Sequence, residues 1–139
     1  MESYGSDLIG QEWFDQRMHV SHHEFIRDPF QDYQPKDAGS WVYNNGETYR
    51  NKFRRYGVHW KDAWNLDYYI DGVLVRSVPG PNIIDPENYT NGTGLNKPMH
   101  IILDMEHQPW REVKPNASEL ADPKKSIFWV DWIRVYKAQ

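Results

Sequence analysis

The stretch WVDWIRVY, residues 129–136, decides the fold class of this chain. Together with the preceding phenylalanine, its side chains alternate between the two faces of an extended chain. One face carries Phe128, Val130, Trp132 and Arg134, and the other carries Trp129, Asp131, Ile133 and Val135. Because both faces are largely apolar, the stretch predicts a β-strand that is covered on both sides.

Other alternating runs predict further strands. They are residues 17–27, 53–60, 64–70, 73–78 and 98–106, and residues 1–4 resemble the end of another strand. Asp71 and Gly72 stand between two of these runs, which is a strong signal of a β-hairpin. Six or so strands without a convincing amphipathic helix predict an all-β protein, an antiparallel β-sandwich.

The segments between the predicted strands are long and irregular. Residues 28–47 and 79–97 are rich in proline, glycine or asparagine and are expected to be loops. A short helical turn is expected near residues 118–120.

Composition excludes several classes of partner. The chain has 139 residues, which suits one domain, and its net charge of -4 gives no broad basic field for nucleic acid or an anionic membrane surface. It has no cysteine, hence no disulfide and no thiolate metal site, and the redox compartment stays undecided. Neither a membrane-spanning apolar run nor a signal peptide is present in the sequence.

Aromatic residues are unusually frequent, with 7 Trp, 9 Tyr and 5 Phe. Flat rings fill protein cores, and they also stack on the C–H faces of sugars. Core packing is the better interpretation for any single ring, but the excess as a whole is suggestive of a sugar-binding surface.

Several long stretches, in one order, resemble glycoside hydrolase family 16 and within it the marine β-agarases. They are MESYG (1–5), EWFDQRMHVSHHEFIRDPFQDYQPKDAGSW (12–41), YGVHWKDAWNLDYYIDGVLVRSV (56–78), DMEHQPWR (104–111) and VDWIRVYK (130–137). The resemblance implies a concanavalin-like β-jelly roll whose concave sheet holds a linear agar-type galactan. It also implies endo-acting, retaining hydrolysis of β-1,4-galactosidic linkages in agarose, without a cofactor for catalysis. The full-length protein would be bacterial and secreted or held at the cell surface.

The opening residues MESYG resemble the end of the family motif E-x-D-x-x-E, which makes Glu2 the general acid/base. The nucleophilic Glu and the assisting Asp of that motif would lie five and three residues before Glu2. We therefore expect residues 1–139 to be the C-terminal part of one catalytic domain, incomplete at the N-terminal side. A retaining glycosidase needs two carboxyl groups about 5–5.5 Å apart, and the negative nucleophile raises the pKa of the acid. Without that neighbour, Glu2 is not expected to be an acid near neutral pH.

Substrate contacts are expected on the strand at residues 17–27. Alternation places Met18 and Val20 towards the core. The opposite, polar face carries His19, Ser21, His23 and Arg27. By the resemblance, His23 and Arg27 contact the substrate. A zinc site at His19, His22 and His23 is disfavoured, because the metalloprotease pattern needs two histidines on one helix face.

Two further groups follow from the resemblance. Glu106 is placed in the groove with Trp110 and Arg111 near it, although from the sequence alone Glu106 is equally well an exposed strand end. Asp131 lies in a largely apolar strand, so a buried carboxylate there is expected to have a partner. In the wider family an Asp at this place helps to bind a structural cation, so a structural calcium is one candidate, and a salt bridge or a backbone contact is an equally good one.

Other functions remain open from the sequence. A β-porphyranase shares the fold and the carboxylates, and a carbohydrate-binding module or a lectin-like scaffold would share the sandwich and its aromatic rings. The isolated chain is also expected to self-associate through unpaired sheet edges.

Overall fold

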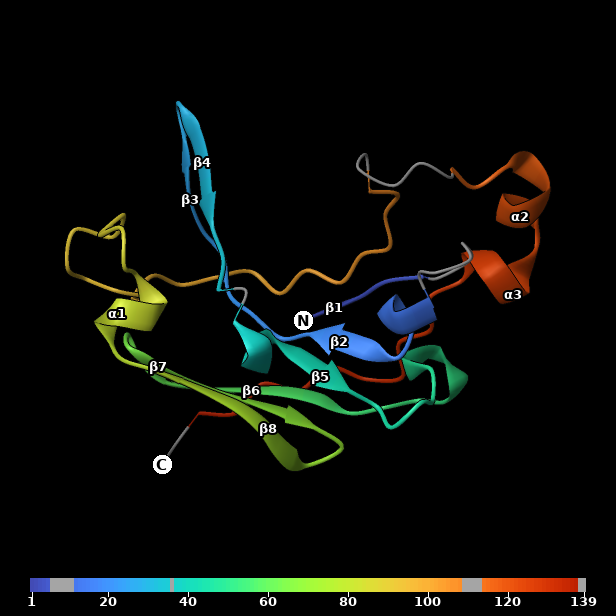
Figure 1. Cartoon of the computed structure of the whole chain (residues 1–139), viewed down its shortest axis with the longest axis horizontal. Coiled ribbons are helices and arrows are strands. Elements are labelled where there is room, and N and C mark those ends of the chain that lie inside the picture. Colours follow the sequence, from blue (N-terminus) through green and yellow to red (C-terminus); the bar gives the residue numbers. More distant parts are fainter. Residues whose placement is uncertain (6–11, 36, 109–113, 138–139) are drawn as a thin grey trace. The chain divides into compact units, whose positions relative to one another are not determined.

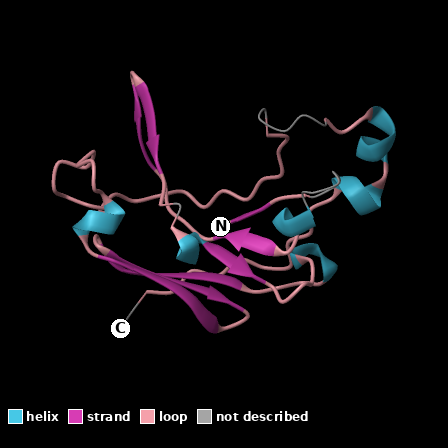
Figure 2. Cartoon of the chain, in the orientation of Figure 1, coloured by secondary structure: helices cyan, strands magenta, loops and turns pink. Residues whose placement is uncertain are grey.

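The structure is a computed structural model that describes residues 1–5, 12–35, 37–108 and 114–137. The chain divides into two compact units, Met1–Pro98 and Met99–Gln139. Among the described residues, all strands belong to the first unit, and Figure 2 distinguishes the strands from the short helices and the loops. No helix in the described ranges is long and apolar enough to cross a membrane.

Two three-stranded antiparallel sheets form the frame of the first unit. One sheet has the order β1 (Glu2–Ser3), β2 (Arg17–His19), β5 (Trp41–Tyr43), and the other has the order β6 (Tyr56–Asp62), β7 (Asn65–Ile70), β8 (Val73–Pro79). A separate hairpin, β3 (Glu24–Arg27) and β4 (Phe30–Tyr33), rises away from them (Figure 1). The antiparallel pairing and the small number of short helices confirm the predicted all-β class.

The helical elements are short. In the first unit they are the 3-10 helices η1 (Glu12–Phe14), η2 (Ala38–Ser40) and η3 (Tyr49–Asn51) and the helix α1 (Pro81–Ile84). The second unit contains α2 (Ala117–Ala121) and α3 (Pro123–Ser126). Asn116 caps α2, because its side chain accepts a hydrogen bond from the Glu119 N–H while the Glu119 carboxylate accepts one from the Asn116 N–H. This capping box explains why the predicted turn near residues 118–120 is helical.

The core lies between the two sheets. Its buried residues are Met18, Val20, Tyr49, Leu66, Tyr68, Ile70, Val78 and Ile84. Met18 and Val20 come from β2 and the residues just after it, so the predicted orientation of both side chains is confirmed. Because apolar faces of both sheets contribute to one core, the unit is a β-sandwich, as predicted.

The predicted hairpin at Asp71 and Gly72 is confirmed in register. Ile70 pairs with Val73, and both turn residues have positive φ, 53° at Asp71 and 85° at Gly72. These two angles define the hairpin turn whose twist matches that of the flanking strands. The alternating side chains and the Asp-Gly turn lie within a few residues of each other, so the sequence alone could predict this hairpin.

The strand predicted at residues 17–27 is broken in two. After β2 the chain leaves the sheet, and the Val20 N–H donates to the Ser40 carbonyl oxygen at 2.7 Å while the Ser21 hydroxyl donates to the Pro35 carbonyl oxygen at 3.1 Å. The chain then re-enters an extended form as β3 and pairs with β4. Strands β4 and β5 lie in the segment expected to be a loop, because runs of four and three residues are too short to show an alternating pattern.

The strands predicted at residues 98–106 and 129–136 are wrong in this structure. Both segments are extended, but no ladder pairs them in the described part of the chain. Their apolar side chains are exposed, with 77% of Ile102 and 77% of Val135 accessible. A strand exists only where a neighbour accepts and donates its backbone hydrogen bonds, and the alternating pattern cannot supply that neighbour.

Candidate active site

The carboxyl of Glu2 lies between two strands that present polar side chains to it. In the register of β1 and β2, Glu2 is opposite His19, so both side chains point to the same face of the sheet. The His19 Nδ1 donates to Glu2 Oε2 at 3.1 Å, and the Tyr4 hydroxyl donates to the same oxygen at 2.7 Å. Tyr4 follows Glu2 by two residues, which is the spacing that brings side chains to one face of an extended chain.

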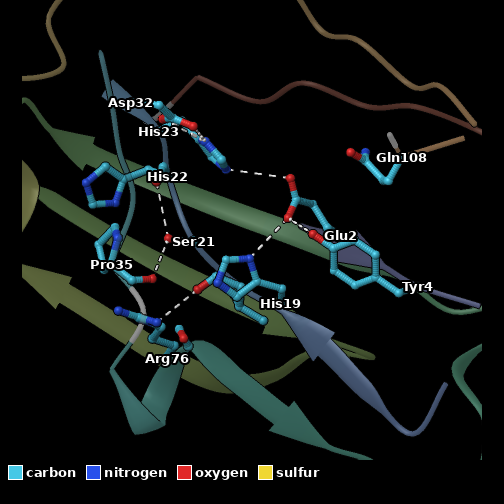
Figure 3. Close-up of polar contacts among 12 residues, drawn as sticks. Glu2, Tyr4, His19, Ser21, His22, His23, Asp32, Pro35, Arg76 and Gln108 are labelled. Carbon is cyan, nitrogen blue, oxygen red and sulfur yellow. Dashed lines mark hydrogen bonds and ion pairs between the residues drawn. The ribbon is translucent and has the colours of Figure 1, made fainter. Parts of the chain in front are cut away.

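His23 approaches the other oxygen of Glu2. Its Nε2 lies 3.6 Å from Glu2 Oε1, and its Nδ1 lies 3.1 Å and 3.2 Å from the two carboxylate oxygens of Asp32 (Figure 3). The break after β2 makes this possible, because it turns the chain so that His23 faces Glu2 from the base of the β3–β4 hairpin. Glu2 and His23, both predicted as site residues, are thus brought together.

These contacts fix the charge of Glu2. Hydrogen bonds from His19 first and from His23 next outweigh the effect of burial and hold the pKa of Glu2 well below its ordinary range. In turn, the hydrogen bond with Glu2, followed by the influence of Asp32, raises the pKa of His23 against the opposing effect of burial. In this arrangement Glu2 is a carboxylate beside an imidazole whose cationic form is favoured, and Glu2 holds no proton to donate near neutral pH.

A small hollow lies beside the Glu2 carboxylate. It is lined by Met1, Glu2, His19, Ser21 and His23 and has about 30 Å³ of space. That space suits a water molecule and is too small for a sugar ring. The hollow therefore leaves room for a water next to the carboxylate, the position that a general base needs, but the lowered pKa makes Glu2 a weak base in this arrangement.

The other two histidines of the cluster have different roles. His19 is 3% exposed and its ring packs at 4.5 Å from that of Trp41, so it is part of the sheet interior as well as a partner of Glu2. His22 is buried, and its Nε2 donates to the Ile84 carbonyl oxygen at 2.8 Å. Burial lowers the pKa of His22, which keeps it neutral.

Arg27 lies at the outer end of the hairpin. It pairs with Phe30 across the two strands, and its guanidinium lies 5.7 Å from the centre of the Phe25 ring. Arg27 and Phe25 are on the same hairpin face as Asp32, the partner of His23, because residues two apart on a strand share a face. Its predicted contact with the substrate stays a prediction.

The places of the remaining predicted residues in the groove stay predictions. Glu106 belongs to the second unit, is exposed, and accepts a hydrogen bond from the Gln108 side chain. Trp110 and Arg111 lie outside the described residues. The burial expected of Asp131 is wrong, since it is exposed in an unpaired segment. Within the described ranges no group of three or more His, Asp or Glu could hold a metal ion, and the calcium at Asp131 stays a prediction.

Sequence reasoning missed two residues of the site, Tyr4 and Asp32, and a buried acid next to His23 in the chain. Tyr4 could have been found, because a period of two from Glu2 points to it. Asp32 could not, because it depends on strand β4. The buried acid is Glu24, which is 5% exposed and whose carboxylate oxygens receive no hydrogen bond from the described residues. Burial, followed by the neighbouring Asp85 carboxyl, raises the pKa of Glu24 to about 8.

A carboxylate held by imidazoles on a β-sandwich is compatible with a carbohydrate-active protein, and comparison with known proteins makes the class specific. The sequence profile described as Beta-porphyranase A-D, GH16 domain, matches residues 1–138. The chain therefore belongs to glycoside hydrolase family 16, and the resemblance stated from the sequence is confirmed.

Curated relatives of high identity are named as agarases. Beta-agarase AgaA of Microbulbifer thermotolerans is 56% identical over 99% of this chain and 33% of its own length. Beta-agarase A of Zobellia galactanivorans is 56% identical over 99% of this chain and 25% of its own length. The beta-agarase of Phocaeicola plebeius is 54% identical over 98% of this chain and 44% of its own length. The chain thus spans less than half the length of these relatives.

Solved structures agree with the fold. A crystal structure of beta-agarase A in complex with oligoagarose matches 68% of this chain and 35% of its own, at 56% identity and a TM-score of 0.64. An inactivated mutant of beta-agarase B in complex with agaro-octaose matches 62% of this chain and 32% of its own, at 55% identity and a TM-score of 0.59. The jelly-roll class expected from the resemblance is confirmed by these neighbours.

Proposed function

We propose that this chain is the part of an endo-acting, retaining β-agarase that carries the general acid/base, Glu2. The observation that carries the proposal is the identity of 56% to named β-agarases over 99% of the chain. The contacts of Glu2 with His19 and His23 support the assignment, because they hold one carboxyl in a fixed position next to a water-sized hollow.

Glu2 would act twice in this reaction. First it protonates the leaving glycosidic oxygen while a second carboxylate attacks the anomeric carbon, and then it takes a proton from the water that hydrolyses the glycosyl–enzyme bond. By the resemblance, that second carboxylate lies five residues before Glu2, outside the 139-residue sequence. Its negative charge at about 5–5.5 Å would raise the pKa of Glu2 and so supply the proton that the present contacts withhold.

The same proposal covers the substrate and its contacts. The substrate is an agar-type galactan, cleaved at β-1,4-galactosidic linkages, and His23, Arg27, Glu106, Trp110 and Arg111 contact it. A structural calcium at Asp131 belongs to the proposal as well. We also propose that the full-length protein acts outside the cell, since one relative, 33% identical, is named an extracellular agarase of Streptomyces coelicolor.

A chimera tests the proposal. The chimera is beta-agarase A of Zobellia galactanivorans in which the 139-residue chain replaces the matching 25% of the sequence. The chimera is expected to release reducing ends from agarose by internal cleavage and with retention of configuration. A correctly folded chimera that binds agarose without cleaving it would favour a carbohydrate-binding domain instead.

A β-porphyranase is the second candidate. The family profile bears that description, and beta-porphyranase B of Phocaeicola plebeius is 33% identical over 61% of this chain. Higher kcat/KM of the chimera on porphyran than on agarose, measured side by side, would make the porphyranase the better assignment.

A further inference from the structure

We propose that Asp32 is a positioning residue, which holds the His23 ring against the Glu2 carboxyl. The three side chains form a line across two strands and a loop. Asp32 contacts His23 Nδ1 with both oxygens, at 3.1 Å and 3.2 Å, and His23 Nε2 faces Glu2 Oε1 at 3.6 Å (Figure 3). The catalytic role of Asp32 rests on the proposed function of Glu2, whereas the contact of Asp32 with His23 does not depend on it.

The hairpin builds this contact. Phe25 pairs with Asp32 across β3 and β4, and His23 precedes Phe25 by two residues on the same side of the extended chain. His23 and Asp32 are therefore diagonal neighbours on one hairpin face, a separation that long side chains bridge. Among the described residues no hydrogen bond or ion pair joins Asp32 to Glu2 directly, so the contact between them passes through the His23 ring.

Contact with Asp32 determines which ring nitrogen of His23 carries a proton. A carboxylate only accepts hydrogen bonds, so Nδ1 must be the donor to Asp32. A neutral ring would then present a bare Nε2 to the ionised Glu2, which is repulsive, whereas the imidazolium presents an N–H. Two carboxylates on opposite sides of one ring therefore favour its cationic form.

Other ionisable groups face the same ring or its partner. From β1 and the chain start these are Glu2 and the Met1 amino group, and from β2 it is His19, which donates to Glu2. The preceding His22 is neutral and bonded to the Ile84 carbonyl oxygen, so it does not replace Asp32 as a partner of His23. Asp32 is the carboxylate that faces His23 on the side away from Glu2.

The contact between Asp32 and His23 matters because Glu2 must act first as an acid and then as a base. An imidazolium beside Glu2 stabilises the carboxylate that remains after the proton has been donated. Removing the charge of Asp32 weakens the imidazolium and so makes Glu2 easier to protonate. Asp32→Asn is therefore expected to lower the pKa of His23 and to raise that of Glu2.

Nuclear magnetic resonance titration of the 139-residue chain tests this directly and needs no agarase activity. At pH values above the midpoint of His23, where its ring is neutral, the wild-type spectrum should show the proton on Nδ1, and the Nε2–H tautomer would overturn the proposal. In Asp32→Asn the midpoint of His23 should fall and that of Glu2 should rise. Glu87→Gln, which removes an exposed carboxylate elsewhere in the same unit, should leave both midpoints unchanged.

A pH–rate profile of the chimera gives an independent second measurement, which decides the matter where the isolated chain gives no usable spectra. The basic limb of the kcat/KM profile reports the pKa of the general acid, Glu2. Asp32→Asn should move this limb to higher pH by roughly half a pH unit, the size expected for a partly exposed pair of charges. In a His23→Gln background the same substitution should have no effect on the limb. A folded Asp32→Asn enzyme whose limb does not move would show that Asp32 only stabilises the hairpin. A chimera without any activity would instead count against the proposed function, and the titration would still decide the role of Asp32.

Discussion

The protonation of Glu2 depends on side chains that are distant from it in the sequence. His19 lies 17 residues away and meets it through strand pairing. The resemblance identified Glu2 and His23 separately, as the acid/base and as a substrate contact, and Tyr4 follows from strand periodicity. Asp32 could not be reached, because its place depends on the pairing of β3 with β4, which leaves no local pattern in four residues.

In the chimera, Glu2→Gln is expected to lower kcat on agarose by about 10²- to 10⁴-fold, the range of general acid–base catalysis. The amide keeps the shape of the side chain but can neither give nor take the proton. An aryl glycoside with a good leaving group needs no acid in its first step, so its first step should be slowed less. Burst kinetics on both substrates measure this, with Glu87→Gln as control, and equal losses on the two substrates would contradict the acid role.

Glu24 makes stability depend on pH. Unfolded, its carboxyl ionises above about pH 4.3, whereas in the folded chain its pKa is about 8. Between these values the unfolded state loses a proton that the folded state keeps, so stability falls as pH rises through this window and levels off above it. Below the window both states are protonated and the group contributes nothing.

Glu24→Gln should remove that fall, because the amide is neutral at every pH and can donate to Asp85. We expect the variant to gain on the order of 1–2 kcal/mol relative to wild type between pH 4.5 and pH 8. Urea unfolding at several pH values measures the difference. A constant offset across the whole range would show that Glu24 is ionised in the folded chain.

At the scale of elements, the hairpin of β7 and β8 was predicted and the strands at residues 98–106 and 129–136 were not found. The difference is physical. A hairpin carries its partner strand within a few residues, whereas an isolated alternating run needs a neighbour from far along the chain. The broken strand at residues 17–27 is of the same kind, since the carbonyl oxygens of Ser40 and Pro35 draw the chain out of the sheet.

Gly72→Ala tests the importance of the turn of that hairpin. The residue has a φ of +85°, which a side chain with Cβ adopts only under strain, and the variant is expected to lose about 1 kcal/mol or more of stability. Gly57→Ala is the matched control, because its Cβ would make ordinary contact with Tyr69 at 3.6 Å and no positive φ is involved. Urea unfolding of both variants gives the comparison, and equal losses would mean that the turn conformation is not what matters.

For the molecule as a whole, the first question is whether the 139-residue polypeptide works alone. The groups that contact the Glu2 carboxyl in the described part of the chain are Tyr4, His19 and His23, and none of them is a carboxylate. Retaining hydrolysis without a nucleophile has no covalent route. We expect no release of reducing ends from agarose by the purified 139-residue chain, and turnover at rates typical of enzymes would refute the two-carboxylate assignment.

The second unit governs how the isolated polypeptide behaves in solution. Its extended segments expose large apolar side chains, including 69% of Trp129 and 77% of Val135, and no strand ladder pairs their backbone in the described part of the chain. Exposed apolar segments with free backbone groups pair with other chains. We therefore expect the isolated chain to dimerise, aggregate or remain partly molten.

Sedimentation velocity and thermal unfolding of the isolated chain measure this. Ile133→Lys with Val135→Lys should reduce association, since charged side chains on an exposed strand oppose edge-to-edge pairing. Lysines at the exposed positions Glu87 and Leu74 of the first unit serve as the control and should change it little. A monodisperse monomer with one sharp transition would show that the chain is an autonomous domain, because its apolar segments would then have to be covered by the chain itself.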